Sequence, residues 1–290
     1  MSRLTRYLKR GVHYILHGQP TMVVSPQIAI LAPSELLKGR TALITGGTRG
    51  IGKEIAKAFI NAGANVIITS RTLENADIVV KELRKKYPNS LIYGFALDNS
   101  DVEHIKDKFD KIIQTIYPIK IDCLVNNAGL LGGKFGNTSI QEWNKIIDIN
   151  LRGVFFLSEL VVNYMKINSI AGNILMIASS SSLRPAVSAY TIGKWGLRGF
   201  TLGLAKICAP YGITVNGLAP GPTATEMVGV MDNSDIYREE SPIKRYILPE
   251  EIANMAVILC SDVSRSIIGD IIYMTGGAGL ITLDDVKYKF

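Results

Sequence analysis

From residue 40 onward, short apolar runs alternate with longer segments in which apolar residues recur at helical spacing. Most of the runs are continuously apolar, which is typical of parallel strands covered by helices on both faces. Repeated strand–helix–strand units predict a single α/β domain built on a doubly wound parallel sheet. The strands are expected at residues 41–45, 65–69, 91–96, 122–126, 173–178, 213–218 and 270–274.

The first 38 residues differ from the rest, and we divide the chain into an arm, 1–38, and a domain, 39–290. The arm is basic and has no acidic residue before Glu35. This composition leaves two alternatives: a mitochondrial transit peptide, or an arm retained in the folded protein and packed on the domain or a neighbouring subunit. Its bulky apolar residues and few serines favour the retained arm.

Composition limits the classes of partner. The net charge is +7, of which residues 1–38 carry +4, so the domain has little excess charge and no nucleic-acid partner is expected. No run of 18 apolar residues occurs, so no stable membrane insertion is expected, although the arm leaves a membrane-surface role open. The three cysteines and three histidines form no metal-ligand pattern, so no metal is expected. The separated cysteines suit a reducing compartment, the cytoplasm unless the arm is a transit peptide.

A glycine-rich stretch, "TGGTRGIG" (45–52), follows the first strand and precedes a helix that begins near Arg49. Glycines at 46, 50 and 52 allow a tight turn and a close approach to a pyrophosphate, and the helix start offers free N–H groups to phosphate. Strand, turn and helix in this order predict a dinucleotide site of the Rossmann type.

The end of the second strand indicates which dinucleotide binds. An acidic residue there would hold a ribose 2′-hydroxyl, but the sequence reads Thr69-Ser70-Arg71. The forked cation of Arg71 suits a 2′-phosphate, and Arg49 in the turn adds a second cation. We therefore expect NADP(H) rather than NAD(H).

Tyr190 and Lys194 are spaced so that their side chains meet on one face of a helix. A phenol with an ordinary pKa near 10 transfers protons poorly at neutral pH. A neighbouring ammonium and the positive nicotinamide are expected to lower the pKa of the phenol, and a serine hydroxyl can hold a carbonyl oxygen in line. The pair therefore predicts proton transfer to a carbonyl that accepts hydride from the cofactor.

Six motifs in order resemble the short-chain dehydrogenase/reductase family, over about residues 39–280. They are "TGGTRGIG" (45–52), "NNAG" (126–129), "IDINLRGVFF" (147–156), "ASSSS" (178–182), Tyr190 with Lys194, and "VNGLAPGPTAT" (215–225). The resemblance implies the catalytic set Asn150, Ser179, Tyr190 and Lys194, with Asn150 holding a water that links Lys194 to solvent. Ser180 stays open as the alternative serine, because the spacing to Tyr190 is shorter than in the family.

The same resemblance implies the cofactor site. Asp98 would accept from the adenine amino group, Asn126 would contact the adenosine ribose, and Lys194 would bind the nicotinamide ribose. The full expected set is Gly46, Thr48, Arg49, Gly50, Ile51, Gly52, Ser70, Arg71, Asp98, Asn126, Ala128, Gly129, Tyr190, Lys194, Pro220, Gly221, Thr223 and Thr225.

These expectations combine into an NADP(H)-dependent oxidoreductase that interconverts a ketone and a secondary alcohol. A 3-oxoacyl thioester and a small cyclic or sugar-derived ketone both stay open as substrates. The alternative is a non-catalytic nucleotide-binding sensor or scaffold with the same fold. In the variable segment 226–247, Met227, Met231, Ile236 and Tyr237 either line an apolar pocket or form a buried face. The family implies a homodimer or homotetramer.

Overall fold

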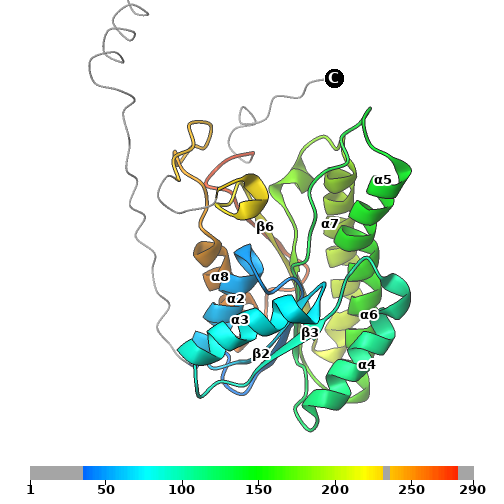
Figure 1. Ribbon diagram of the computed structural model, residues 1–290, viewed down its shortest axis with the longest axis vertical. Coiled ribbons are helices and arrows are strands. Elements are labelled where there is room, and N and C mark those ends of the chain that lie inside the picture. The colour runs from blue at the N-terminus through cyan, green and yellow to red at the C-terminus, as the bar shows by residue number, and fades with distance from the viewer. Residues whose placement is uncertain (1–34, 231–235, 280–290) are drawn as a thin grey trace, which may run out of the picture.

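The computed structural model describes residues 35–230 and 236–279 and confirms the doubly wound α/β fold (Figure 1). All seven predicted strands are present within two residues of their expected bounds, and they form one parallel sheet in the order β3-β2-β1-β4-β5-β6-β7. The strands are β1 Thr41–Ile44, β2 Asn65–Ser70, β3 Ile92–Ala96, β4 Cys123–Asn126, β5 Asn173–Ile177, β6 Thr214–Pro220 and β7 Ile271–Met274.

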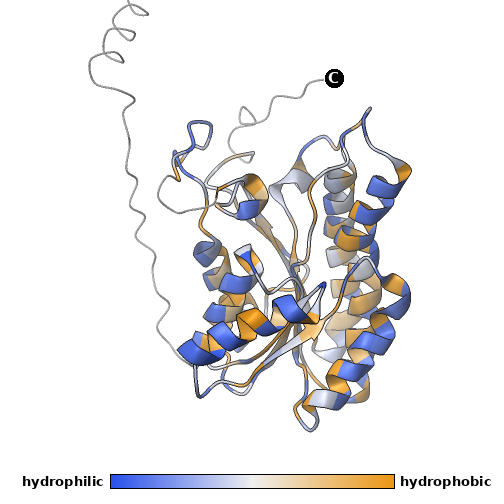
Figure 2. Ribbon diagram, viewed as in Figure 1, coloured by the Kyte–Doolittle hydropathy of each residue, from blue (hydrophilic) through white to orange (hydrophobic). Residues whose placement is uncertain are grey.

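Helices cover both faces of the sheet and bury two hydrophobic clusters against it. Residues of α2, α3 and α8 build one cluster, and residues of α4, α6 and α7 build the other, so the apolar strands are buried on both sides. Figure 2 shows hydrophobic and hydrophilic residues interspersed along these helices, as expected when one helix face meets a sheet. The helices are α2 Gly50–Asn61, α3 Leu73–Lys86, α4 Ile105–Ile116, α5 Ile140–Ile147, α6 Gly153–Ile167, α7 Ala189–Cys208 and α8 Pro249–Leu259.

The strand order reverses between β1 and β4. The chain builds outward from β1 through β2 to β3, and then returns to place β4 on the other side of β1, where Ile44 pairs with Val125. Loops that leave β1 and β4 must therefore diverge at their carboxyl ends, and this divergence opens a crevice in sheets of this kind. The glycine turn follows β1 and the "NNAG" motif ends β4, so topology alone brings the two motifs together.

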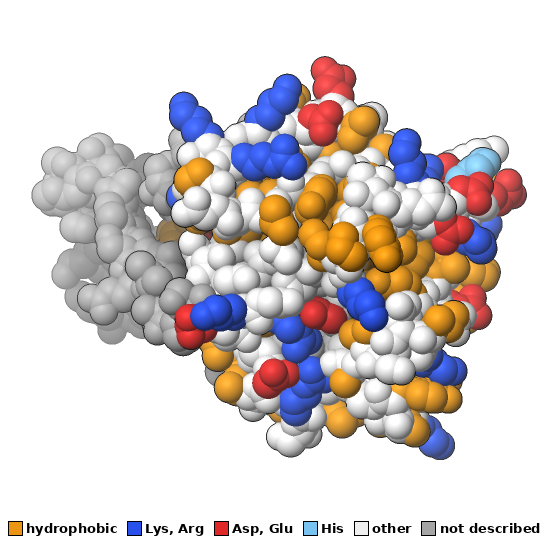
Figure 3. Space-filling view, turned by 90° about the horizontal axis from the view of Figure 1, so that it is seen from below, with side chains coloured by type: hydrophobic (Ala, Val, Ile, Leu, Met, Phe, Trp, Pro, Cys, Tyr) orange, Lys and Arg blue, Asp and Glu red, His pale blue; other side chains and the backbone are white. Residues whose placement is uncertain are grey.

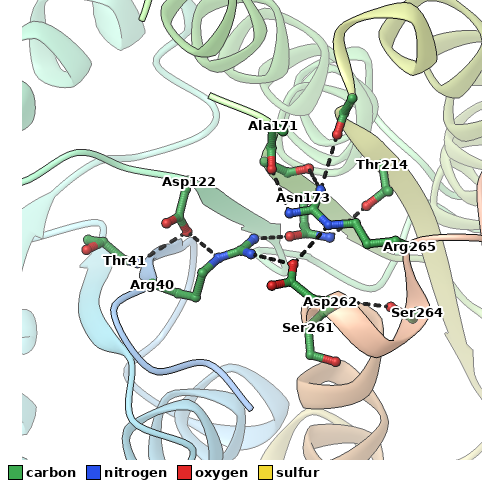
Figure 4. Close-up of polar contacts among 12 residues, drawn as sticks. Arg40, Thr41, Asp122, Ala171, Asn173, Thr214, Ser261, Asp262, Ser264 and Arg265 are labelled. Carbon is green, nitrogen blue, oxygen red and sulfur yellow. Dashed lines mark hydrogen bonds and ion pairs between the residues drawn. The ribbon is translucent and has the colours of Figure 1, made fainter. Parts of the chain in front are cut away.

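A network of charged and polar side chains joins the amino ends of the strands, opposite the crevice (Figure 4). The guanidinium of Arg40 pairs with Asp122 at 3.0 Å and with Asp262 at 3.2 Å, and it also donates to the side chain of Asn173. Arg265 pairs with the same Asp262 at 3.0 Å and donates to main-chain carbonyls that precede β5 and β6. Two carboxylates and two arginines thus hold β1, β4, β5 and β6 together at this end.

The arm predicted at residues 1–38 lies mainly outside the described residues, and so does its alternative reading as a transit peptide. Residues 35–38 are described, and Leu37 is buried in the core with its N–H donated to the carbonyl of Ala62 at 2.9 Å. The buried core thus already includes Leu37, two residues before the predicted boundary. On the face in Figure 3, Lys and Arg side chains are interspersed with Asp and Glu, and no continuous basic patch forms there.

Candidate active site

A cleft of about 630 Å³ lies at the carboxyl ends of the strands, between the glycine turn, the "NNAG" loop and the start of α7. It brings together most of the residues that the sequence predicts for catalysis and cofactor binding. Gly52, Asn126 and Asn150 do not line it. The predicted residues that do are Gly46, Thr48, Arg49, Gly50, Ile51, Ser70, Arg71, Asp98, Ala128, Gly129, Ser179, Tyr190, Lys194, Pro220, Gly221, Thr223 and Thr225.

The start of α7 positions the tyrosine–lysine pair. Ser188 caps the helix by accepting the N–H of Thr191 at 3.1 Å, and the Thr191 hydroxyl accepts the N–H of Ser188 at 3.0 Å. This reciprocal cap fixes where the helix begins and therefore where Tyr190 and Lys194 emerge. The ammonium of Lys194 donates to the carbonyl of Ile177 at 2.7 Å and lies 5.7 Å from the centroid of the Tyr190 ring.

Burial dominates the protonation of this pair. It lowers the pKa of the Lys194 ammonium to about 8, because only 4% of this residue is exposed. It also raises the pKa of Tyr190 above its usual value, while a hydrogen bond with Ser179 acts in the opposite direction. Among the protein's own groups, desolvation of the phenolate therefore outweighs the hydrogen bond with Ser179. The expected lowering by Lys194 together with the nicotinamide remains a prediction.

Among the serines after β5, the geometry favours Ser179 over Ser180. Both serines are buried, but Ser179 lines the cleft and acts on the pKa of Tyr190 through a hydrogen bond, whereas Ser180 does not line the cleft. The next turn holds Ser179 in place, because its hydroxyl accepts the N–H of Ser181 at 3.1 Å and its carbonyl accepts the Ser182 hydroxyl at 2.8 Å. Ser181 and Ser182 thus support the loop, as the sequence allowed.

The glycine turn offers unpaired donors to the cleft. Helix α2 begins at Gly50 with neither a side-chain cap nor an acidic residue in its first turn. Within the described residues, no protein acceptor pairs with the N–H groups of residues 48–51. A helix end with open N–H groups and no carboxylate is suited to a phosphate. The turn therefore fits the pyrophosphate of a dinucleotide.

The side chain of Asn126 does not reach the cleft, and its predicted contact with the adenosine ribose remains a prediction. Asn126 is the last residue of β4 and points into the core, where its amide donates to the Ser158 hydroxyl at 2.9 Å and to Met176. The sequence analysis missed its neighbour, Asn127, which lines the cleft and donates to the carbonyls of Thr45 at 2.9 Å and Gly46 at 3.0 Å. Successive residues of a strand point to opposite faces. The motif "NNAG" therefore indicated that an asparagine lines the cleft, but not which of the two.

Gly52 serves the turn by packing and not by lining the cleft. A Cβ atom at this position would lie 2.3 Å from the carbonyl oxygen of Gly46 and 2.4 Å from the Asn127 amide nitrogen. Only glycine allows α2 to approach the turn this closely, so the third glycine holds the other two in place.

Asn150 also lies outside the cleft. It sits in a π-helical turn, Asp148–Arg152, between α5 and α6, and its amide donates to the carbonyls of Leu130 and Ile146, both at 2.8 Å. Since Leu130 lines the cleft, Asn150 anchors the loop that follows β4. Its predicted role in holding a water near Lys194 remains a prediction.

The adenosine end of the cleft contains a cation and unpaired polar groups. Arg71 is exposed, and no ion pair involves it among the described residues. Asp98 accepts the N–H and the hydroxyl of Ser100 with one carboxylate oxygen, at 2.9 and 2.7 Å. The neighbouring Asn99 is 3% exposed, and its amide nitrogen and oxygen have no partner within the described chain. Buried unpaired amides are unfavourable, so this end suits a ligand with its own donors and acceptors.

The segment after β6 divides between cleft and core. Met227 lines the cleft and is half exposed, whereas Ile236 is buried against Ala224 and Leu248. Met227 therefore fits the pocket alternative, and Ile236 fits the alternative of a buried face. Met231 lies outside the described residues. A bidentate ion pair of Arg245 with Glu251, at 2.7 and 2.8 Å, fixes the end of the segment to α8.

Within the described part of the chain, none of the helices has the length and apolarity that crossing a membrane requires. No cluster of histidine, cysteine, aspartate or glutamate side chains in it could hold a metal ion.

Known proteins with similar sequences are oxidoreductases. A family model described as "Enoyl-(Acyl carrier protein) reductase" matches residues 46–279. The 3-oxoacyl-[acyl-carrier-protein] reductase of Aquifex aeolicus is 36% identical over 246 residues, covering 83% of this chain and 98% of that protein. A 3alpha-hydroxysteroid dehydrogenase of Mediterraneibacter gnavus is 33% identical over 248 residues, covering 84% and 98%.

Solved structures of oxidoreductases are similar to this chain as well. The gluconate 5-dehydrogenase of Burkholderia cenocepacia, solved in complex with NADP and tartrate, has a TM-score of 0.76 and 30% identity, covering 84% of this chain and 97% of that one. These relatives are named for different substrates, and what they share is oxidoreductase chemistry. It also favours an enzyme over a non-catalytic sensor of the same fold. From the matched model, these relatives and the assembled cleft, the chain belongs to the short-chain dehydrogenase/reductase family of oxidoreductases.

Proposed function

We propose that this protein is an NADP(H)-dependent reductase that converts a ketone to a secondary alcohol, and the reverse. The observation that carries the proposal is one cleft that holds Ser179, Tyr190 and Lys194 together with the open glycine turn. The cofactor supplies the hydride when it is bound. The residues of the chain must then bind it, place the carbonyl and supply one proton.

Each of the three side chains has a part in that proton transfer. The Ser179 hydroxyl is placed to donate to a carbonyl oxygen, because it already hydrogen-bonds Tyr190. The Tyr190 phenol gives its proton to that oxygen as the carbonyl carbon gains hydride, and the product is the neutral alcohol. Lys194 stabilises the resulting phenolate and is placed to hold the nicotinamide ribose. Its pKa of about 8 makes its charge sensitive to pH near neutrality.

The proposed function is tested by following NADPH absorbance with a panel of ketones. The panel contains a 3-oxoacyl thioester, a 3-ketosteroid and a keto-sugar acid, because the relatives are named for these three classes. Saturable NADPH oxidation with one class supports the proposal and names the substrate. No turnover with any class, in a protein that binds NADPH, would favour the nucleotide-binding sensor instead.

Arg71→Ala is expected to weaken NADPH binding about 10- to 100-fold, the range for one lost charge-assisted contact. NADH binding should change less than about twofold, because NADH carries no 2′-phosphate. Titration of protein fluorescence with each nucleotide measures both effects. Lys81→Ala on the outer side of α3 serves as the control for loss of one positive charge. An equal loss for NADH and NADPH would exclude Arg71 as the 2′-phosphate residue.

The rate of NADPH oxidation is expected to fall as the pH rises through about 8. Below that pH Lys194 is charged and can hold the ribose and stabilise the phenolate, and above it the ammonium loses its proton. The dependence of kcat/KM on pH reports this ionisation in the free enzyme. In Lys194→Arg the charge persists, so any remaining activity should not show the fall near pH 8. The same fall in that variant would assign the ionisation to another group.

We also propose that the protein forms a homo-oligomer through α6 and α7. These helices leave large apolar side chains exposed, including Phe155 at 45%, Trp195 at 40% and Leu202 at 49%. Phe155 and Phe200 stack across the two helices with ring centroids 5.1 Å apart, so the exposed groups form one ordered surface. Apolar surfaces of this kind mark interfaces between proteins.

Phe155→Glu combined with Leu202→Glu is expected to turn the oligomer into a monomer in sedimentation velocity experiments. Two buried carboxylates without partners would prevent the helices from pairing. Val263→Glu, at a position that is 68% exposed and away from α6 and α7, should leave the sedimentation coefficient unchanged. A wild-type protein that sediments as a monomer at micromolar concentration would refute the interface.

A further inference from the structure

A short segment after β6 lies directly on the glycine turn. Thr225 is so close to the turn that a Cβ atom on Gly50 would lie 3.4 Å from its methyl carbon. The 3-10 turn η5, Glu226–Val228, follows at once, and its residues line the cleft. The segment and the turn are therefore two sides of one cleft, although 177 positions separate Arg49 from Glu226.

One ion pair joins the two sides. A terminal nitrogen of the Arg49 guanidinium lies 3.4 Å from a carboxylate oxygen of Glu226. Both side chains are largely exposed, at 69% and 56%, and both line the cleft. No other ion pair of either residue is present within the described chain.

The proposed function gives Arg49 a second possible partner. The sequence analysis predicts that this arginine, together with Arg71, binds the 2′-phosphate of NADP(H). A phosphate carries more negative charge than a carboxylate and accepts the arginine fork bidentately, so it competes well for the same guanidinium. When Arg49 turns to the phosphate, the Glu226 carboxylate is left unpaired next to a second anion, which is unfavourable.

We propose that Glu226 is a specificity-determining residue that competes with the cofactor's 2′-phosphate for Arg49. The carboxylate lowers the affinity for NADP(H) and has little effect on NAD(H), which lacks the phosphate. Binding of NADP(H) exchanges the Arg49–Glu226 pair for an Arg49–phosphate pair and releases η5 from the glycine turn. This inference rests on the proposed function, because it requires that Arg49 reads the 2′-phosphate.

The test is a double-mutant cycle on nucleotide affinity. In Glu226→Gln, NADPH and the fragment 2′,5′-ADP should bind about two- to fivefold more tightly, the range for one exposed ion pair. NADH affinity should stay within about 1.5-fold, and the gain for NADPH should shrink in 0.5 M salt as screening increases. Glu240→Gln changes another half-exposed carboxylate of the segment 226–247 that does not line the cleft, and it should have no effect.

Arg49→Ala separates this inference from the proposed function. If Arg49→Ala weakens NADPH binding and abolishes the effect of Glu226→Gln, the competition is supported. If Arg49→Ala weakens NADPH binding but Glu226→Gln has no effect in the wild-type background, the competition is refuted and the phosphate role of Arg49 stands. If Arg49→Ala leaves NADPH affinity unchanged, the phosphate role fails and the competition fails with it. Thermal unfolding of each variant verifies that the fold is intact.

Discussion

Tyr190→Phe is expected to lower kcat by about 10²- to 10⁴-fold while NADPH binds as before. The phenol oxygen is the only group removed, so the carbonyl loses its proton donor and the ring still fills its place at the start of α7. The result is measured as the rate of NADPH oxidation at saturating ketone, beside a fluorescence titration of NADPH. Loss of catalysis without loss of cofactor is what distinguishes an acid from a binding residue.

The matched control is Tyr211→Phe, which removes a phenol oxygen from a tyrosine that is 49% exposed and lies outside the cleft. Its kcat should equal that of the wild type. A Tyr190→Phe variant that retains more than about a tenth of the wild-type kcat would show that another group, or water, delivers the proton. Ser179→Ala then tests whether the serine carries out that transfer.

Arg40→Ala is expected to lower the free energy of unfolding by about 3 to 5 kcal/mol, the range for removing one partner of a buried ion pair. The side chains of Arg40 and Asp122 are 14% and 20% exposed. Burial raises the pKa of Asp122 more than Arg40 lowers it, so this carboxylate is already desolvated in the intact protein. Without Arg40 it would have no guanidinium partner, and Asn173 would also lose a donor. Urea unfolding followed by circular dichroism measures the change.

Two variants separate the fork of Arg40 from its charge. Arg40→Lys retains the charge but cannot reach Asp122, Asp262 and Asn173 at once, so its loss should lie between those of the wild type and Arg40→Ala. Arg152→Ala removes a more exposed arginine with one partner, Asp148, and should change the unfolding free energy by less than about 1 kcal/mol. Equal losses of unfolding free energy in Arg40→Ala and Arg152→Ala would show that the network at the amino ends of the strands stabilises the fold no more than an exposed ion pair does.

Local patterns predicted the sheet and most of the cleft. The seven strands were visible because residues buried on both faces form continuous apolar runs. The glycine turn was visible because its strand–glycine–helix order is itself local, and Tyr190 and Lys194 because one helical turn separates them. Topology then brought these segments together, since loops after parallel strands share one edge of the sheet.

Side-chain orientation and burial could not be predicted from local patterns. The strand directs the side chain of Asn126 into the core and leaves that of Asn127 for the cleft. The sequence also contained no sign that burial would raise the pKa of Tyr190 and lower that of Lys194. The direction of a side chain and its burial depend on what packs against the residue, so neither follows from the residues next to it in sequence.

By itself the sequence determined the fold class, the order of the strands along the chain and the chemistry of the glycine turn and the tyrosine–lysine pair. Only the tertiary structure decided the pairing of Arg40 with Asp122, 82 positions away, and of Arg49 with Glu226, 177 positions away. The physical reason is range: helices, strands and turns follow from interactions within a few residues, whereas an ion pair depends on distance in space after the sheet has assembled.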